Sequence, residues 1–197
     1  ASNGGTHTAW EDVALIREIP GAVICDPADD VQMEWIIKEF LKMEGIHYVR
    51  SNRKAVRNVY KKGSSFKIGQ GNILKEGKDI LIIAAGQLVS EALDCAEELE
   101  KEGYSVEVID MFTIKPLDEK LLIKEAKGKS KIVTIENHSI YGGLGSAVSE
   151  VIAENGISVP VKRIGVKEKF GQVGTAEFLQ EEFGLTAKQI KETICQF

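Results

Sequence analysis

The second half of the chain alternates continuous apolar runs with stretches that are apolar on one side only. Residues 80–85 are all apolar and are followed by Gly86, a pattern typical of a strand buried on both faces. Residues 88–102 carry apolar side chains at every third or fourth position, which predicts a helix ended by Gly103. The same reasoning predicts strands over 105–110, 131–136 and 160–165, helices over 118–126 and 146–154, and final helices that open at Thr175 and Thr186. Such alternation with short connections predicts a mostly parallel sheet with helices on both faces.

The first fifty residues follow a similar but shorter pattern. It predicts a helix over 8–18, a buried strand over 22–25, a helix that begins at Asp29 and a strand over 46–49. Thr8 with Glu11, and Asp29 with Gln32, have the spacing of helix-capping pairs. The apolar stripe of the second helix consists of Met33, Ile36, Ile37, Phe40 and Leu41. Two strands and two helices bury too little surface to enclose a core, so we expect that half of this domain is absent from the chain.

A polar, glycine-containing connector over 51–77 separates the two patterns, and we place the domain boundary there. The charge of the chain is concentrated in this region. Between Arg50 and Lys78 there are nine lysines and arginines and a single acidic residue, although the whole chain has a net charge of −5. A solvated basic linker explains this run, and recognition of a sugar phosphate by one or two of its cations is the alternative.

Composition narrows the function classes. A net charge of −5 argues against a nucleic-acid binder, and no apolar run is long enough to cross a bilayer. The three cysteines are far apart and form no C-x-x-C pair, which favours reduced thiols in a cytoplasmic protein over a disulfide scaffold or a zinc site. The three histidines show no metal-ligand spacing either. The sequence therefore predicts a cytoplasmic globular protein without a membrane or nucleic-acid partner.

The strongest candidate for chemistry lies near the start of the chain. Gly4 and Gly5 precede Thr6 and His7, and glycines let a backbone approach a bound molecule closely. If the helix begins directly after His7, the imidazole lies on a loop at a helix N-terminus, where polar substrates are commonly held. A histidine on a solvated turn is the alternative interpretation.

The sequence around His7 resembles the transketolase family, in which a G-x-T-H-x-x-x-E-D run leads into R-x-I-P and then P-A-D. The matching residues are Gly4, Thr6, His7, Glu11, Asp12, Arg17, Ile19, Pro20, Pro27, Ala28 and Asp29. Further matching runs lie at 113–118, 136–145, 163–166 and 170–171. The resemblance covers essentially the whole chain. It is nearest to the C-terminal subunit of split transketolases, with deoxyxylulose-phosphate synthase as the sister family.

The resemblance implies an α/β fold of two parts. Residues 1–53 would be the second half of a thiamine-diphosphate pyrimidine-binding (Pyr) domain, and 54–77 a linker. Residues 78–197 would be the transketolase C-terminal α/β domain, three layers with a mostly parallel sheet. In the family roughly a hundred residues precede the histidine motif within the same domain. They include the glutamate that activates the cofactor, so the chain resembles a fragment or processed product.

The resemblance also implies site residues. His7 would contact the hydroxyls or carbonyl of the substrate near the reacting carbons, since an imidazole can donate or accept a proton at cell pH. Asn3 stands where the family usually has an aspartate that reads a sugar hydroxyl. Arg53 aligns with the arginine that grips the sugar phosphate, and Arg50 is the competing candidate.

Two further sequence features, the glycines of 142–145 and His138, are interpreted as structural and not as catalytic. The glycines of 142–145 could cradle a phosphate, but a tight strand-to-helix turn needs the same residues and is the favoured interpretation. His138 is expected in a loop at the domain interface and not as a catalyst.

The implied activity is transfer of a two-carbon ketol unit from a ketose phosphate to an aldose phosphate, in the pentose phosphate pathway. The complete enzyme would use thiamine diphosphate and Mg²⁺, with none bound to this chain alone. Expected partners are sugar phosphates, an N-terminal transketolase subunit or domain, and a second copy in a homodimer formed through the C-terminal domain. Deoxyxylulose-phosphate synthase and the β component of a 2-oxo-acid dehydrogenase E1 remain alternatives. A non-catalytic subunit-association module is an alternative of another class.

Overall fold

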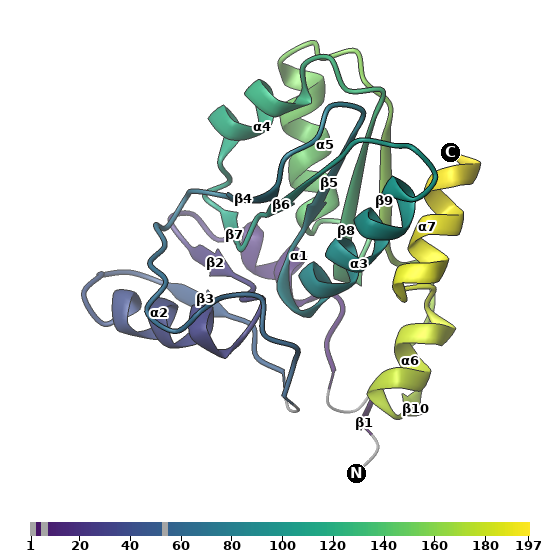
Figure 1. Ribbon diagram of the computed structural model, residues 1–197. Helices are drawn as coiled ribbons and strands as arrows, with labels where there is room; N and C mark the ends of the chain where they lie inside the picture. Colours follow the sequence, from purple (N-terminus) through teal and green to yellow (C-terminus); the bar gives the residue numbers. More distant parts are fainter. Residues whose placement is uncertain (1–2, 5–7, 53–54) are drawn as a thin grey trace.

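The computed structural model describes residues 3–4, 8–52 and 55–197, and its largest element is a five-stranded sheet (Figure 1). The strand order is β4-β6-β5-β8-β9. β5 pairs in parallel with both β6 and β8, β8 pairs in parallel with β9, and β4 is an antiparallel edge strand. The strands are β4 (Asn72–Lys75), β5 (Ile80–Ala84), β6 (Val106–Asp110), β8 (Lys131–Ser139) and β9 (Val161–Val166). The prediction of a mostly parallel sheet is confirmed.

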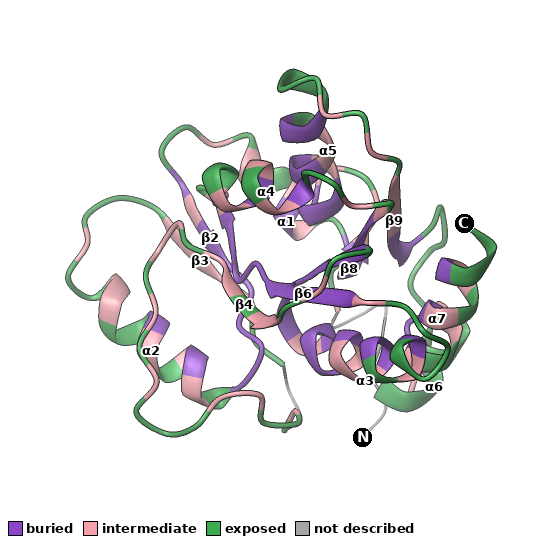
Figure 2. Ribbon diagram, turned by 45° about the horizontal axis from the view of Figure 1, so that its top comes forward, coloured by how far each residue is buried: buried purple, intermediate pink, exposed green. Residues whose placement is uncertain are grey.

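Helices cover both faces of this sheet, so the larger part has three layers. On one face, Ile80, Ile82 and Ala84 pack in a core with helices α3 (Val89–Glu100) and α7 (Ala187–Gln196). On the other face, Leu81 and Ile83 pack with α4 (Glu119–Ala126) and α5 (Leu144–Glu154), and with Val13 of α1 (Asp12–Arg17). Figure 2 shows β6 and β8 buried between these helix layers. Successive side chains of β5 therefore pack into two different cores, one on each face of the sheet, as expected for a strand buried on both faces.

A second sheet has three strands in the order β3-β2-β7. β2 (Val23–Cys25) pairs in parallel with β3 (His47–Val49) and antiparallel with β7 (Thr113–Lys115). β7 comes from the part of the chain that follows the predicted linker, so the smaller sheet uses strands from both halves of the sequence. Its core consists of Cys25, Ile36 and Phe112.

Helix α2 (Asp30–Phe40) covers the smaller sheet incompletely. Asp29 accepts a hydrogen bond from the backbone N–H of Gln32 at 2.9 Å, which confirms the predicted cap. Of the predicted apolar stripe only Ile36 is fully buried, while Ile37 is 44% exposed and Leu41 is 83% exposed.

The predicted start of the first helix is wrong. The described helix α1 begins at Asp12, and its N-cap residue Glu11 makes no capping hydrogen bond. The carboxylate of Glu11 instead accepts the backbone N–H of Trp10 at 2.8 Å. The backbone carbonyl of Trp10 accepts the N–H of Ser139 in β8, also at 2.8 Å. This tertiary contact holds the segment outside a helix and overrides the local capping pattern.

The described part of the connector lies against both sheets. The carboxylate of Asp29 accepts the backbone N–H groups of Val59 and Tyr60 at 2.8 and 2.7 Å. The hydroxyl of Tyr60 donates to Asp110 at the end of β6, at 2.6 Å. Strand β4 also falls within 54–77, the segment expected to be a linker. The proposed division at 1–53, 54–77 and 78–197 stays a prediction.

The start of the chain lies beside a late segment. Strand β1 (Asn3–Gly4) pairs antiparallel with β10 (Val173–Gly174), directly before helix α6 (Ala176–Glu182). Figure 1 shows this pair below the C-terminal helices. The predicted caps of the last two helices are confirmed, since Thr175 and Thr186 accept the N–H groups of Phe178 and Gln189. None of the helices formed by the described residues combines the length and apolar character that crossing a membrane requires.

Candidate functional site

A cavity of about 570 Å³ lies between the loop before α1, the segment that follows β3, and helix α6. The loop contributes Thr8, Ala9 and Trp10 to its lining. The opposite walls are formed by Tyr48 and Val49 of β3 with residues 50–52 and 55–57 after it, by Gln87, Ser90 and Glu91, and by residues of α6 with Phe183 and Leu185. The lining mixes carboxylates, guanidinium groups and aromatic rings, which suits a polar ligand of several functional groups.

The described neighbours of two predicted site residues meet at this cavity. His7 and Arg53 themselves lie outside the described residues. Thr8 and Ala9, the two residues after His7, line this cavity. Asn52 and Ala55, which precede and follow the pair Arg53–Lys54, line it as well. Asn3 lies in β1. The roles of His7, Arg53 and Asn3 stay predictions.

Arg50 joins three elements at the wall of the cavity. Its guanidinium donates to Asp12 in α1 at 2.9 Å and to Asp26 after β2 at 3.0 Å. It also donates to the backbone carbonyls of Asn137 and Ala9, at 3.0 and 3.2 Å. Burial alone would lower the pKa of Arg50, but the charges of Asp26 and Asp12 raise it above its ordinary value. Arg50, the alternative candidate for binding the sugar phosphate, therefore has its guanidinium N–H groups hydrogen-bonded to other groups of the protein.

Asp12 also binds a second side chain at this point. The hydroxyl of Tyr48 donates to Asp12 at 2.8 Å, and burial together with this carboxylate raises the pKa of Tyr48 to about 12. Sequence reasoning noted Asp12 only as part of the family motif and missed Asp26. A buried carboxylate is indicated by an acidic residue directly after an apolar strand, as in Cys25-Asp26, but its partner 24 residues later cannot be read from spacing.

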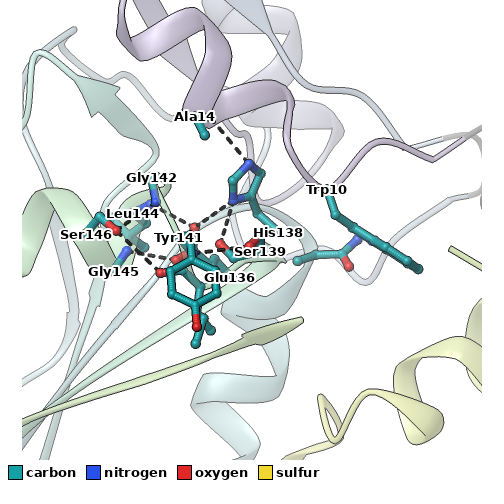
Figure 3. A network of polar contacts seen from close by, with 12 residues as sticks. Trp10, Ala14, Glu136, His138, Ser139, Tyr141, Gly142, Leu144, Gly145 and Ser146 are labelled. Atoms are coloured by element: carbon teal, nitrogen blue, oxygen red, sulfur yellow. Dashed lines mark hydrogen bonds and ion pairs between the residues drawn. The ribbon is translucent and has the colours of Figure 1, made fainter. Parts of the chain in front are cut away.

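The glycine loop before α5 is occupied by a carboxylate of the protein (Figure 3). Glu136 of β8 is almost fully buried and accepts the backbone N–H groups of Leu144 and Gly145 at 2.7 and 2.8 Å. A Cβ on Gly143 would lie 2.0 Å from the same carboxylate, so only glycine fits there. Burial raises the pKa of Glu136 to about 7, against the lowering effect of the two N–H groups. These glycines serve an internal turn, and sequence reasoning favoured the turn without finding Glu136.

His138 connects β8 to helix α1, as Figure 3 shows. Its Nε2 accepts the backbone N–H of Ala14 at 3.4 Å, and its Nδ1 lies 2.7 Å from the carbonyl oxygen of Ser139. With Nδ1 as the donor, the ring is neutral, and burial lowers the pKa of His138 in agreement with that state. The residue lies in strand β8 and not in a loop, and it contacts α1 from the first part of the sequence; its place at a domain interface stays a prediction.

The comparisons with known proteins agree with this fold. The family model described as "Transketolase, C-terminal domain" matches residues 69–190. The chain is 42% identical over 188 residues to the 6-deoxy-6-sulfo-D-fructose transketolase subunit SqwH of Clostridium sp. (strain MSTE9), covering 95% of this chain and 58% of that protein. It is 40% identical over 196 residues to the putative transketolase C-terminal section of Methanocaldococcus jannaschii, covering 98% and 61%.

Solved structures show the same arrangement. A structure titled "Split gene transketolase, inactive beta4 tetramer" matches with a TM-score of 0.89 and 38% identity, over 98% of this chain and 62% of that one. The transketolase of Pichia stipitis matches in fold with a TM-score of 0.77 and 23% identity, over 98% of this chain and 27% of that one. The chain belongs to the transketolase family, which confirms the resemblance found in its sequence. It spans about three fifths of the length of the first relatives, 58% and 61%.

Proteins of this family depend in general on thiamine diphosphate, and the described residues do not fit that cofactor. The one helix N-terminus preceded by the glycine loop already holds the carboxylate of Glu136, which would repel a diphosphate. Among the described residues there is also no group of three or more His, Cys, Asp or Glu side chains that could hold a metal ion. The glycine loop before α5 is therefore not a diphosphate site, and the cavity of about 570 Å³ is the candidate for substrate binding.

Proposed function

We propose that this chain is the C-terminal part of a transketolase, which transfers a two-carbon ketol unit from a ketose phosphate to an aldose phosphate. Membership of the family and the relatives named as transketolase subunits support the proposal. The observation that carries it is that the described neighbours of His7 and of Arg53 line a single cavity. Two segments that the family uses for substrate contact thus border the same space.

We propose a donor ketose with a terminal anionic group. The relatives are named for 6-deoxy-6-sulfo-D-fructose and for apulose 4-phosphate, so their names point to a sulfonate in one case and a phosphate in the other. Arg53 would pair with that anion, because the guanidinium fork matches its oxygens. The amide of Asn3 would bind a sugar hydroxyl. His7 would hold the hydroxyls or carbonyl near the reacting carbons and exchange a proton with them. If xylulose 5-phosphate is the donor, the enzyme acts in the pentose phosphate pathway.

The reactive cofactor belongs to the complete enzyme. We propose that thiamine diphosphate and Mg²⁺ are bound outside the described residues of this chain, in contact with an N-terminal transketolase subunit or domain. We expect calorimetric titration of the chain alone with the cofactor and Mg²⁺ to show no micromolar binding. Micromolar binding to the isolated chain would contradict this assignment.

The proposed assembly is a homodimer through the C-terminal domain, in the cytoplasm, with an N-terminal partner. Exposed apolar side chains, namely Leu15 on α1, Ile37 on α2 and Leu41 directly after α2, support a docking surface. A solved relative is titled an inactive β4 tetramer, which supports the expectation that the chain alone lacks activity. Light scattering with and without the partner subunit tests both statements, and a clean monomer that does not bind the partner would contradict them.

Reconstitution tests the activity itself. The chain is combined with an N-terminal transketolase subunit, thiamine diphosphate and Mg²⁺, and ketol transfer is measured with xylulose 5-phosphate, 6-deoxy-6-sulfo-D-fructose and apulose 4-phosphate as donors. His7→Ala is expected to lower kcat by about 100-fold or more. His47→Ala is the matched control, since His47 lies in β3 and is not part of the cavity lining. Normal turnover by His7→Ala would show that His7 has no catalytic role.

The same assay separates the alternatives. A preference for pyruvate as donor would indicate deoxyxylulose-phosphate synthase or a 2-oxo-acid dehydrogenase component. No turnover with any donor, despite stable assembly and bound cofactor, would indicate a non-catalytic association module.

A further inference from the structure

The parallel strands β5 and β8 end at the wall of the candidate cavity. Their ladder runs in register up to the pair Ala84 and Ile135. After β5 the chain enters the short helical turn η1 (Gly86–Leu88) and then α3, whereas β8 leads to α5. Helix α3 packs on one face of the sheet and α5 on the other, as Figure 2 shows. The connections thus diverge to opposite faces at these two strand ends, and ligands of open α/β sheets bind in the crevice outside such a point.

One carboxamide side chain from each strand end lines the cavity at this point. Gln87 lies in η1, and Asn137 lies in β8 two residues beyond Ile135. The turn η1 is in contact with β8, and both residues are partly buried in the lining of the cavity. Their backbone carbonyls accept from Ser90 and Arg50, at 3.2 and 3.0 Å. Within the part of the chain that the structure describes, neither side-chain amide has a hydrogen-bond partner.

The turn that carries Gln87 is held in place by a buried carboxylate residue. The backbone N–H of Gly86 donates to the backbone carbonyl of Asp26 at 3.0 Å. A Cβ on Gly86 would lie 2.5 Å from the carboxylate of Asp26, and the φ of 65° at Gly86 also favours glycine. Asp26 is in turn bound by Arg50 at 3.0 Å. The backbone of Gln87 therefore has a defined place, and its amide is presented from a rigid support.

The charged groups beside these amides are already paired within the protein. The guanidinium of Arg50 binds the carboxylates of Asp12 and Asp26, and Glu91 accepts the backbone N–H of Ala187 at 2.7 Å. The groups left for a ligand at the ends of β5 and β8 are neutral carboxamides, each of which can both donate and accept hydrogen bonds. Sugar hydroxyls also donate and accept, whereas an anion only accepts and would leave the amide oxygens without a donor.

We propose that Gln87 and Asn137 form a hydroxyl-binding subsite at the ends of β5 and β8, with Gln87 as a specificity-determining residue. The inference rests on the proposed function, in which a ketose occupies the cavity. It adds that the second half of the sequence binds hydroxyl groups of that sugar. A site built to bind a hydroxyl discriminates against an analogue that lacks it, because the partner amide is then left unpaired.

Binding is tested with a neutral polyol on the full chain reconstituted with its N-terminal partner subunit. Xylitol is the probe, because it carries several hydroxyl groups and no charge, and saturation-transfer NMR measures its dissociation constant. Gln87→Leu keeps the approximate size of the side chain without its amide and is expected to raise this constant about 10-fold. Asn137→Ala is expected to act in the same direction. Gln70→Leu is the matched control, since Gln70 is exposed and does not belong to the cavity lining.

The ketol-transfer assay gives a second readout. Gln87→Leu is expected to raise KM for the donor ketose about 10-fold and to leave kcat within about 2-fold, because the hydrogen bond is made in the ground state and the transition state alike. Gln70→Leu should leave both values unchanged. Melting temperatures of the variants show that each of them is folded.

The outcomes separate this subsite from the activity itself. Unchanged xylitol binding and unchanged KM in both Gln87→Leu and Asn137→Ala would overturn the proposal, as would the absence of xylitol binding to the wild type. Displacement of xylitol by inorganic phosphate would overturn it too, because an anion would then occupy the subsite. If the wild-type enzyme transfers no ketol unit, the proposed function fails. Xylitol binding that depends on Gln87 but not on Gln70 would still support the hydroxyl-binding subsite in that case.

Discussion

The two sheets of this molecule differ in how completely their side chains are covered. In the five-stranded sheet, every side chain of β5 is buried between two helix layers. In the three-stranded sheet, β3 is only partly buried, and the helix that covers it leaves Ile37 and Leu41 exposed. The five-stranded sheet has both faces covered by helices. The three-stranded sheet is stabilised by residues from the second half of the chain: strand β7, the ring of Phe112, and the carbonyl of Asn137 that accepts from Arg50. The larger part therefore has a closed core of its own, whereas the core of the smaller part includes residues that the larger part supplies.

The junction between the two regions is expected to be the most sensitive point. Arg50→Met leaves the carboxylates of Asp12 and Asp26 without their cation in a mostly buried place, and loss of one partner from a buried ion pair costs about 3–5 kcal/mol. Chemical denaturation measures this loss in the free energy of unfolding. Arg57→Met is the control, because its ion pair with Asp94 is exposed and is worth at most about 1 kcal/mol. Equal effects of the two substitutions would contradict the role of Arg50 as the joint between the sheets.

Truncations in the two regions should have unequal effects. Ile82→Ala in β5 removes a fully buried side chain and is expected to cost about 2–5 kcal/mol. Leu41→Ala after α2 removes a side chain that is 83% exposed and is expected to change the free energy of unfolding by less than about 0.5 kcal/mol. In the assembled enzyme, Leu41→Ala should weaken binding of the partner while Ile82→Ala should not do so selectively. A large loss of stability for Leu41→Ala in the isolated chain would show that the smaller part is complete by itself.

A third test uses pH, and its effect is the smallest. Burial raises the pKa of Asp110 to about 7, and the nearby charge of Asp26 acts in the same direction, although Tyr60 and Gln32 donate hydrogen bonds to Asp110. The folded protein then keeps a proton that the unfolded chain releases near pH 3.9, so this group makes the free energy of unfolding fall as pH rises towards about 7.

Asp110→Asn should remove that part of the pH dependence, because a neutral amide can still accept from Tyr60 and Gln32. The measurement is the difference in denaturation midpoint between wild type and variant from pH 5 to 8.5. The prediction is that the wild type loses stability relative to the variant with rising pH. Parallel profiles would show that Asp110 is ionised throughout.

The elements that could be predicted from the sequence are those determined by local patterns of residues within the element itself. The apolar run of β5 and the Asp29, Thr175 and Thr186 caps are local patterns, and the structure contains them as expected. The start of α1 could not be predicted, because a contact between Trp10 and Ser139, 129 positions apart, outweighs the capping pair. Strands of two or three residues such as β1, β10 and β7 carry no periodicity, and only their distant partners define them.

The candidate site divides in the same way. The segment around His7 was predicted from its glycines and from the family motif, and Arg53 from the family resemblance alone; both residues lie outside the described part of the chain and stay predictions. The carboxylates that organise the surroundings, Asp26 and Glu136, were not found, because burial of a charged group is decided by tertiary partners. Phe183 was missed for the same reason, since its partner Trp10 lies at the opposite end of the sequence.

The order of the smaller sheet has a directional consequence. β2 is its central strand, and among the described residues β3 and β7 each make a ladder with β2 only. The strand β7 follows β6 of the five-stranded sheet after two residues, so this edge lies where the chain passes between the two sheets. A polypeptide that adds alongside β3 by main-chain hydrogen bonds would therefore extend the smaller sheet at the edge that the N-terminal part of the chain supplies.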